Sequence, residues 1–405
     1  MKINKQKIFL FTYAAYICIQ ILSESQFATM EKHSNLLQVL RYVILLAFFG
    51  IGIYFNKKIN KLVAVLLSVL IFSSIVNTLI FNGGLGVLYL IFICFASVNI
   101  DLKKLFIITI ITMIGTYVFV ILCSQIGILQ DTVGIRHLSV VTGEFFAGDY
   151  ARHSMGFIVS NQVPISFIYI YILLIILKKD KLAVWINVVF FITNFWIFYN
   201  FGSRIVFVLT LIVIIMYYFM AVKNMISIRF SLSGFNIYIL IFPVALILSF
   251  LVSIMFNMHS ASMSKLDLIF NHRISMAGEA LRYYGLTVFG LGKDAGTYTG
   301  VYNSIIANTV DNGYVLLFIQ RGIIIGIIVI FLWLMLTNIA YKKKNQYLLF
   351  VLIVLAIENM INADFISYRS IAFYCILLNQ DDQMLESCYR KIIKCHKILY
   401  TSIDK

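Results

Sequence analysis

Long apolar runs follow one another along almost the whole chain, and they restrict its possible folds more than any other feature. Twelve runs of 14 to 26 residues are separated by short polar stretches. Each is close to the ~20 residues that a helix needs to cross a lipid bilayer. Backbone groups in lipid must be hydrogen-bonded internally, which a helix achieves within its own segment. The sequence therefore predicts an all-α, polytopic membrane protein with a single domain over residues 1–405.

The first run, Ile8–Leu22, lacks a small-residue cleavage site, so it is interpreted as a span rather than a signal peptide. The last two runs are short and polar where they meet, which leaves eleven spans as an alternative to twelve. Only 12% of the residues are charged, about half the usual share in a soluble domain. The predicted spans are Ile8–Leu22, Leu36–Phe55, Leu62–Phe81, Leu85–Ile100, Leu105–Leu122, Phe157–Leu177, Leu182–Tyr199, Ile205–Val222, Phe235–Phe256, Val315–Ala340, Tyr347–Ile361 and Phe365–Leu378.

The basic residues decide the orientation. If the N-terminus is cytoplasmic, the short loops NKKINK, DLKK, KKDK and YKKKN all lie on the cytoplasmic side, as does the C-terminal tail. This placement explains the net charge of +15 without a nucleic-acid partner. The six cysteines form no disulfide framework, and Cys388, Cys395 and His396 are interpreted as an ordinary tail rather than a metal site.

Arginine and lysine are distributed differently between the two sides. Eight of the ten arginines, but only three of the 22 lysines, fall outside the cytoplasmic segments. The planar guanidinium group binds carboxylates and phosphates through two parallel hydrogen bonds, whereas lysine offers a point charge. The pattern indicates an anionic ligand at the outer face. The alternative is that these arginines pair with local carboxylates or lipid head groups.

Two outer segments are long enough to build a site, the first outer loop at residues 123–155 and the large outer loop at 257–314. In the large loop, Leu266–Tyr283 is predicted to form an amphipathic helix that carries Arg273 and Glu279. FGLGKDAG, from Phe289, is predicted to be a turn, because it lacks the GK[ST] of a phosphate-binding loop. Asp311 then stands at the entry to the next span.

Three segments together resemble the Wzy-type oligosaccharide repeat-unit polymerases, within the O-antigen ligase/polymerase family. The first is GSR at Gly202–Arg204. The second is R-x-x-M-x-x-E-A-L at Arg273–Leu281, which is followed by FGLG. The third is DNGYVLLFIQRGIIIG at Asp311–Gly326. Ligases of the family typically carry His where Asp311 stands, which favours a polymerase.

The resemblance implies a GT-C-like helical enzyme in a bacterial cytoplasmic membrane, with its active site at the outer face. Such an enzyme transfers a growing glycan from undecaprenyl pyrophosphate to the non-reducing end of a new lipid-linked repeat unit. It acts in capsule, exopolysaccharide or O-antigen synthesis and uses neither a metal nor a nucleotide cofactor. Its implied partners are the lipid-linked oligosaccharide, membrane lipid, and flippase and chain-length regulator proteins.

This chemistry suggests roles for the outer polar residues. Fixed arginines would stabilise the pyrophosphate leaving group, and a base would take the proton of the acceptor hydroxyl. We expect Arg204 and Arg273 to line one cavity, assisted by other residues. The base candidates are Asp311, His272 and Glu279, and the substrate-binding candidates are Arg204, Arg273, Arg282, Arg152, Arg321 and the sugar-stacking Tyr298.

Each role has a simpler alternative. Asp311 could be only a helix cap, His272 a loop residue with no role, and the tyrosines an interfacial belt. Two other classes also compete, a transporter that flips lipid-linked oligosaccharides and a polysaccharide ligase. A transporter would be expected to show charged residues near the midplane and interrupted helices.

Overall fold

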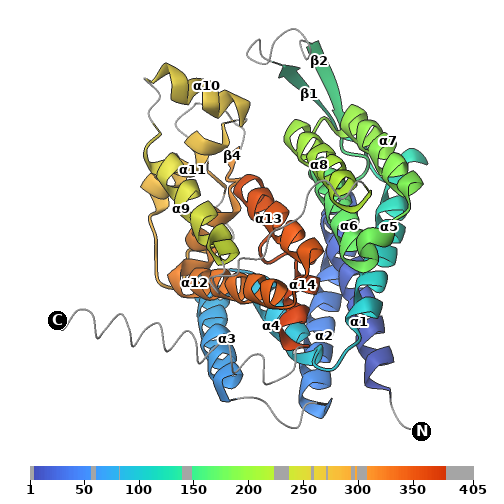
Figure 1. Ribbon diagram of the computed structural model, residues 1–405, viewed down its shortest axis with the longest axis vertical. Coiled ribbons are helices and arrows are strands. Elements are labelled where there is room, and N and C mark those ends of the chain that lie inside the picture. Colours follow the sequence, from blue (N-terminus) through green and yellow to red (C-terminus); the bar gives the residue numbers. More distant parts are fainter. Residues whose placement is uncertain are drawn as a thin grey trace, which may run out of the picture.

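The computed structural model describes residues 4–55, 61–81, 83–138, 148–222, 237–256, 260–270, 272–292, 297–298 and 308–379, and it is dominated by helices (Figure 1). The α-helices are α1 (Lys5–Ser23), α2 (Glu31–Phe55), α3 (Lys61–Phe81), α4 (Gly86–Ala96), α5 (Leu102–Gln125), α6 (Gln162–Lys178), α7 (Val184–Phe201), α8 (Arg204–Tyr217), α9 (Ile241–Ile254), α10 (Ala261–Ile269), α11 (Arg273–Tyr284), α12 (Gly313–Lys342), α13 (Gln346–Ile361) and α14 (Ile371–Leu378). Two antiparallel strand pairs accompany them, β1 (Val133–Leu138) with β2 (Gly148–His153), and β3 (Thr297–Tyr298) with β4 (Asn308–Thr309).

Every predicted span overlaps a helix, but not every helix is long enough to cross a bilayer. Eight helices in the described part of the chain are sufficiently long and apolar. Helices α4, α13 and α14 have only 11, 16 and 8 residues. Large apolar side chains are exposed along the bundle, such as Leu46, Leu79 and Ile111, as expected where lipid is the solvent. An α-helical membrane protein is therefore confirmed, and the number of twelve spans stays a prediction.

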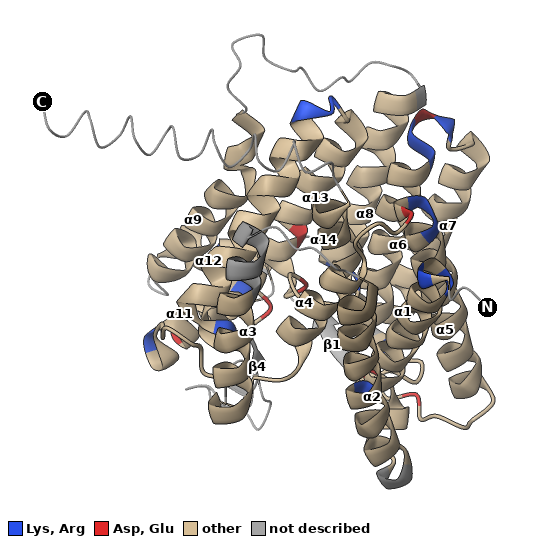
Figure 2. Ribbon diagram, turned by 90° about the horizontal axis from the view of Figure 1, so that it is seen from below, with Lys and Arg blue, Asp and Glu red and all other residues tan. Residues whose placement is uncertain are grey.

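Charged residues interrupt an otherwise uncharged ribbon at only a few places (Figure 2). The β1–β2 hairpin, α10 and α11 lie at the upper end of the molecule in Figure 1, and the N-terminus lies at the lower end. We call the upper end the loop face. The orientation predicted from the basic loops makes the loop face the outer side of the membrane.

The two outer loops contain structure that the sequence analysis did not predict. Residues of the first loop form the β1–β2 hairpin, whose base is closed where Asp131 accepts hydrogen bonds from the backbone N–H groups of Ser154 and Met155. The prediction of one helix over Leu266–Tyr283 was wrong in its middle. Helix α10 ends at Ile269 and α11 begins at Arg273, because His272 adopts a left-handed conformation (φ 62°).

Helix α12 is interrupted at Gly322, whose φ of 86° and ψ of 170° are not helical. A non-helical segment at residues 287–292, which contains FGLG, supplies the hydrogen bonds that the break requires. Its Leu291 N–H donates to the Ile319 carbonyl (2.9 Å), and its Thr287 carbonyl accepts from Ile323 (3.0 Å). Gly290 and Gly322 face each other so closely that a Cβ on either would collide with the backbone of the other segment. Glycine is required at both positions by this approach and by their positive φ angles.

A second interruption separates α13 from α14. Residues 362–370, which we call the 362–370 loop, connect the two helices and pack against the start of α12. A Cβ at Gly313 would collide with the backbone carbonyls of Asn359 and Asn362. The DNG sequence at residues 311–313, where α12 begins, therefore packs directly against the 362–370 loop. A site on one segment is close to a site on the other.

The orientation can be tested by cysteine accessibility. In a variant whose native cysteines are replaced by serine, Ser262→Cys on α10 is expected to react with an impermeant maleimide in intact cells. Lys179→Cys and Lys343→Cys, at exposed positions at the opposite ends of α6 and α12, are expected to react only after permeabilisation. The reverse labelling pattern would place the loop face in the cytoplasm.

Candidate functional site

Arg273 and Asp311, which are 38 residues apart in sequence, form an ion pair. Arg273 is the first residue of α11 and Asp311 immediately precedes the cap of α12. The Arg273 Nε and Nη2 atoms both donate to Asp311 Oδ2, at 3.2 and 3.1 Å. The two helices are held together by a small apolar cluster of Ala277, Ala280, Val310, Val315 and Ile319. This packing explains how residues from two motif segments meet.

Asp311 is not the cap of α12. The cap is Asn312, whose side-chain oxygen accepts from the Val315 N–H (3.2 Å). Asp311 is therefore free of the structural role that its position suggested. Its Oδ1 atom has no hydrogen-bond partner within the described ranges, and 41% of its side chain is exposed. Arg273, by contrast, is buried, and its Nη1 atom is unpartnered in the described structure.

The other candidates of the large loop have different surroundings, and their roles stay predictions. The His272 side chain is 55% exposed, and its Nδ1 atom lies 3.1 Å from the buried carboxylate of Asp267. Glu279, on α11, makes no hydrogen bond or ion pair with any described residue. Arg282 is exposed and donates to the Phe256 carbonyl (3.3 Å). Tyr298 belongs to β3, and its side chain lies outside the described part, as do Cys388, Cys395 and His396.

Arg152 and Arg204 occupy another part of the loop face. Arg204 is the first residue of α8, and it follows the left-handed turn at Gly202. Arg152, on β2, donates from Nε to the Phe201 carbonyl (2.9 Å) and from Nη2 to Asn161. Helices α8 and α11 lie on opposite sides of α13 in Figures 1 and 2. Within the described part of the chain Arg204 and Arg273 do not contact each other, and their convergence on one cavity stays a prediction.

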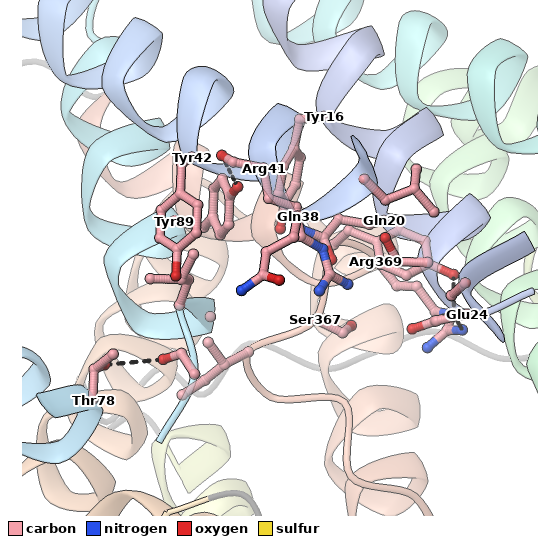
Figure 3. Close-up of a pocket in the computed structure, with 18 of the residues that line it drawn as sticks. Tyr16, Gln20, Glu24, Gln38, Arg41, Tyr42, Thr78, Tyr89, Ser367 and Arg369 are labelled. Carbon is pink, nitrogen blue, oxygen red and sulfur yellow. Dashed lines mark hydrogen bonds and ion pairs between the residues drawn. The ribbon is translucent and has the colours of Figure 1, made fainter. Parts of the chain in front are cut away.

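A cavity of about 820 Å³ lies elsewhere, between α1, α2, the α3–α4 connection and the 362–370 loop (Figure 3). This cavity was not predicted from the sequence. The sequence feature that could have indicated it is the presence of Arg41 and Arg369 inside predicted spans, because ionisable residues at such positions usually mark functional sites. The polar residues that line it are Gln20, Ser23, Glu24, Ser34, Gln38, Arg41, Thr78, Gln162, Asp364, Ser367 and Arg369, with Tyr16, Tyr42, Tyr89 and Tyr368.

Arg369 organises one wall of this cavity. Its side chain is 3% exposed and forms ion pairs with Asp364 (2.8 Å) and Glu24 (3.0 Å). It also donates to Ser166 Oγ (2.7 Å), to the Tyr117 hydroxyl (3.3 Å) and to Gln162. Asp364 comes from the same loop as Arg369, and Glu24 from the end of α1. The remaining partners belong to α5 and α6, so one guanidinium group ties three helices to the 362–370 loop.

Glu24 presents a carboxylate to the cavity. Its Oε2 atom accepts from Arg369 and from the Tyr368 hydroxyl, each at 3.0 Å. Its Oε1 atom has no partner in the described part of the chain. Burial raises the pKa of the Glu24 carboxyl, while the neighbouring positive charge of Arg369 acts in the opposite direction. The Oε2 atom of Glu24 is thus held by two hydrogen bonds, whereas its Oε1 atom has no partner among the described residues.

Arg41 is the second cation of the cavity, and its positive charge acts on the Glu24 carboxyl electrostatically, without a direct contact. Its side chain forms no ion pair or hydrogen bond with the described residues, and its Nε atom is buried. The two carboxylates that line the cavity both contact Arg369 instead. The cavity therefore combines a fixed ion-pair network on one wall with an arginine on the other that forms no ion pair within the described part of the chain.

Arg321 connects this cavity to the third motif segment. It lies on α12 directly before the break at Gly322, and its Nη1 atom donates to the Gly84 carbonyl (3.5 Å). Gly84, Leu85 and Gly86 line the cavity. Arg321 therefore contacts a segment that lines the cavity but does not line the cavity itself. A direct contact between Arg321 and the substrate stays a prediction.

Comparison of the sequence with protein-family models and with curated protein sequences finds no match.

The Arg369 network predicts a large and specific loss of stability. Arg369→Met would leave the buried carboxylate of Asp364 and the partly exposed carboxylate of Glu24 without their counter-ion, and breaking a buried pair typically costs about 3–5 kcal/mol. We expect a clear fall in the thermal unfolding midpoint of the purified protein, monitored by tryptophan fluorescence. The matched control, Arg282→Met, removes an exposed arginine and is expected to stay within about 0.5 kcal/mol of the wild type. Equal midpoints for the two variants would contradict the structural role of Arg369.

Proposed function

We propose that this chain is a polymerase of lipid-linked oligosaccharide repeat units that works at the outer face of a bacterial cytoplasmic membrane. The growing glycan on undecaprenyl pyrophosphate is the donor, and the non-reducing end of a new lipid-linked repeat unit is the acceptor. The proposal assigns the chain to glycosyl transfer without a metal or nucleotide cofactor.

One observation carries this proposal. Two of the three sequence segments that resemble the polymerases, far apart in the chain, belong to one folded unit. Arg273 of the second segment pairs with Asp311 of the third, at 3.1 Å. FGLG, which follows the second segment, is hydrogen-bonded to the interrupted part of α12 within the third, where Gly292 donates to the Gln320 carbonyl (3.1 Å). A similarity of sequence alone would not require these segments to meet.

The geometry of this unit is compatible with glycosyl transfer. In the proposed step, Asp311 Oδ1 takes the proton of the acceptor hydroxyl, and the hydroxyl oxygen forms a bond to the anomeric carbon of the donor sugar. The bond from that carbon to the pyrophosphate oxygen breaks, and undecaprenyl pyrophosphate leaves with the electron pair. Arg273 holds the Asp311 carboxylate in position through Oδ2.

A transporter of lipid-linked oligosaccharides is the second candidate. Two observations favour it, the interruptions at Gly322 and between α13 and α14, and the buried charges of Arg369, Asp364 and Glu24 beside a cavity. Interrupted helices around a polar site are typical of transporters. Such a protein would need no base, whereas the polymerase does, and this difference can be measured at Asp311.

The polymerase proposal predicts that Asp311→Asn blocks polymerisation without unfolding the protein. Asn312 provides the cap of α12, and an asparagine oxygen at position 311 can still accept from Arg273, so the substitution leaves the helix start and its contact with α11 in place. Asparagine cannot take a proton at neutral pH, and removing a general base typically lowers the rate about 10²–10⁴-fold. We expect normal protein levels, loss of long polymer on a gel, and accumulation of single lipid-linked repeat units.

The matched control is Asp101→Asn at the opposite end of the bundle. Asp101 caps α5, because its side chain accepts from the Lys103 N–H (2.9 Å), and asparagine caps helices about as well. This variant is expected to make polymer of normal length. Long polymer from Asp311→Asn would remove Asp311 from the chemistry and would favour a transporter or a different base.

A further inference from the structure

The cavity beside Arg369 contains a second arginine, Arg41, whose side chain forms no ion pair or hydrogen bond with the described residues. A cation that is partly withdrawn from water is costly unless a counter-ion or hydrogen-bond acceptor compensates it. Arg369 is compensated by ion pairs with Asp364 and Glu24, whereas Arg41 acts on Glu24 through space and forms no ion pair in the described structure. Arg41 lies on α2, ten residues after its first residue, and its side chain lines the cavity (Figure 3). This arrangement leaves Arg41 available for an anion that comes from outside the chain.

A second feature of the same wall favours an anion. Helix α4 begins at Gly86, and its cap residue Leu85 makes no side-chain hydrogen bond to the first turn. Gly84, Leu85 and Gly86 all line the cavity. The first N–H groups of a helix carry a partial positive charge and bind phosphate oxygens well. The uncapped start of α4 therefore adds to the positive potential near Arg41.

Arg41 and the start of α4 are close neighbours. Tyr89, one turn into α4, donates from its hydroxyl to the backbone carbonyl of Arg41. This bond fixes α2 against the first turn of α4. The Arg41 side chain and the residues at the start of α4 therefore line the same cavity.

The rest of the lining is suited to a sugar and to a lipid chain. Gln20 and Gln38 offer amide groups that can bind saccharide hydroxyls. Leu79, which is 80% exposed, and Tyr42 also line the cavity and provide an apolar margin. The volume of about 820 Å³ is within the usual range for ligand sites.

We infer that this cavity binds the diphosphate of a lipid-linked saccharide, with Arg41 and the first turn of α4 as the diphosphate contacts and the glutamine side chains as contacts to the first sugar. The identity of this ligand rests on the proposed function, whereas the anion site itself rests on the contacts above. The inference places diphosphate recognition at Arg41, a residue outside the three motif segments.

The experiment measures ligand binding by the full chain in phosphatidylcholine nanodiscs. The probes are farnesyl diphosphate, inorganic pyrophosphate and phosphatidylglycerol, and the readout is the concentration-dependent rise of the unfolding midpoint. We expect farnesyl diphosphate to stabilise the wild type at lower concentration than pyrophosphate, because it offers both the charge and an apolar chain. Arg41→Gln is expected to weaken that binding at least about tenfold, as the loss of charge-assisted hydrogen bonds implies.

Two further variants separate the site from general effects. Lys265→Gln removes one exposed positive charge from α10, far in sequence from the cavity, and is expected to bind as the wild type does. Gln38→Glu changes an exposed residue one turn from Arg41, so it should fold normally. The added carboxylate is expected to pair with Arg41, repel the diphosphate and lower its affinity about as much as Arg41→Gln.

The outcomes are distinguishable. Equal binding of pyrophosphate and farnesyl diphosphate, lost in Arg41→Gln, would support the anion site but assign it a soluble diphosphate. Unchanged farnesyl diphosphate binding in both Arg41→Gln and Gln38→Glu would overturn the site, as would an equal response to phosphatidylglycerol. The polymer assay on Asp311→Asn is a separate measurement, so failure of the binding site and failure of the proposed polymerase can be told apart.

Discussion

The hydrogen bonds of the buried Arg369 side chain are the interaction on which the arrangement of the candidate site depends. A guanidinium group with 3% exposure is tolerated in an apolar bundle only when carboxylates and acceptors surround it. Here they come from the end of α1, from α5, from α6 and from the 362–370 loop. Because arginine offers five N–H donors in a rigid plane, it can fix all four at once. Lysine has only three donors at a single point and could not do so.

This network accounts for the non-helical conformation of residues 362–370. The loop separates α13 from α14. It also brings Asp364 and Arg369 to the cavity and places Asn362 against the first residue of α12. The break of α12 at Gly322 is stabilised in the same way, by hydrogen bonds from the FGLG segment and from Asn77 Nδ2 to the Gln320 carbonyl (2.9 Å). Both interruptions adjoin the cavity, one directly and one through Arg321.

Much of the fold could be predicted from the sequence, because long apolar runs leave few choices in lipid. The runs located the helices, but they could not show that α4 and α14 stop after 11 and 8 residues. The residues that follow both helices are joined by a tertiary hydrogen bond, from Asn379 Nδ2 to the Ser97 carbonyl (2.9 Å), which leaves no local pattern. The hairpin β1–β2 was missed for a similar reason, since its base is held by Asp131 across 22 to 24 residues.

The candidate site was predicted only in part. Spacing and motif order identified Arg273 and Asp311, and the structure places them in contact. The sequence could not distinguish Asp311 from Asn312 as the cap, because both residue types cap helices equally well. Arg41 and Arg369 were visible as charges within predicted spans, but their roles differ completely, one unpaired and one fully paired. That difference follows from the positions of Glu24 and Asp364, which only the folded chain defines.

The central claim is that the chain joins lipid-linked repeat units on the outer side of the membrane. It is tested most directly by locating single repeat units in a strain that lacks the chain, with membrane-impermeant periodate applied to intact spheroplasts before the lipid carrier is extracted. The polymerase account predicts that single undecaprenyl-linked units accumulate in the outer leaflet and are oxidised. Units that accumulate but are protected until the membrane is permeabilised would lie in the inner leaflet, which would contradict the account and identify a defect in transport.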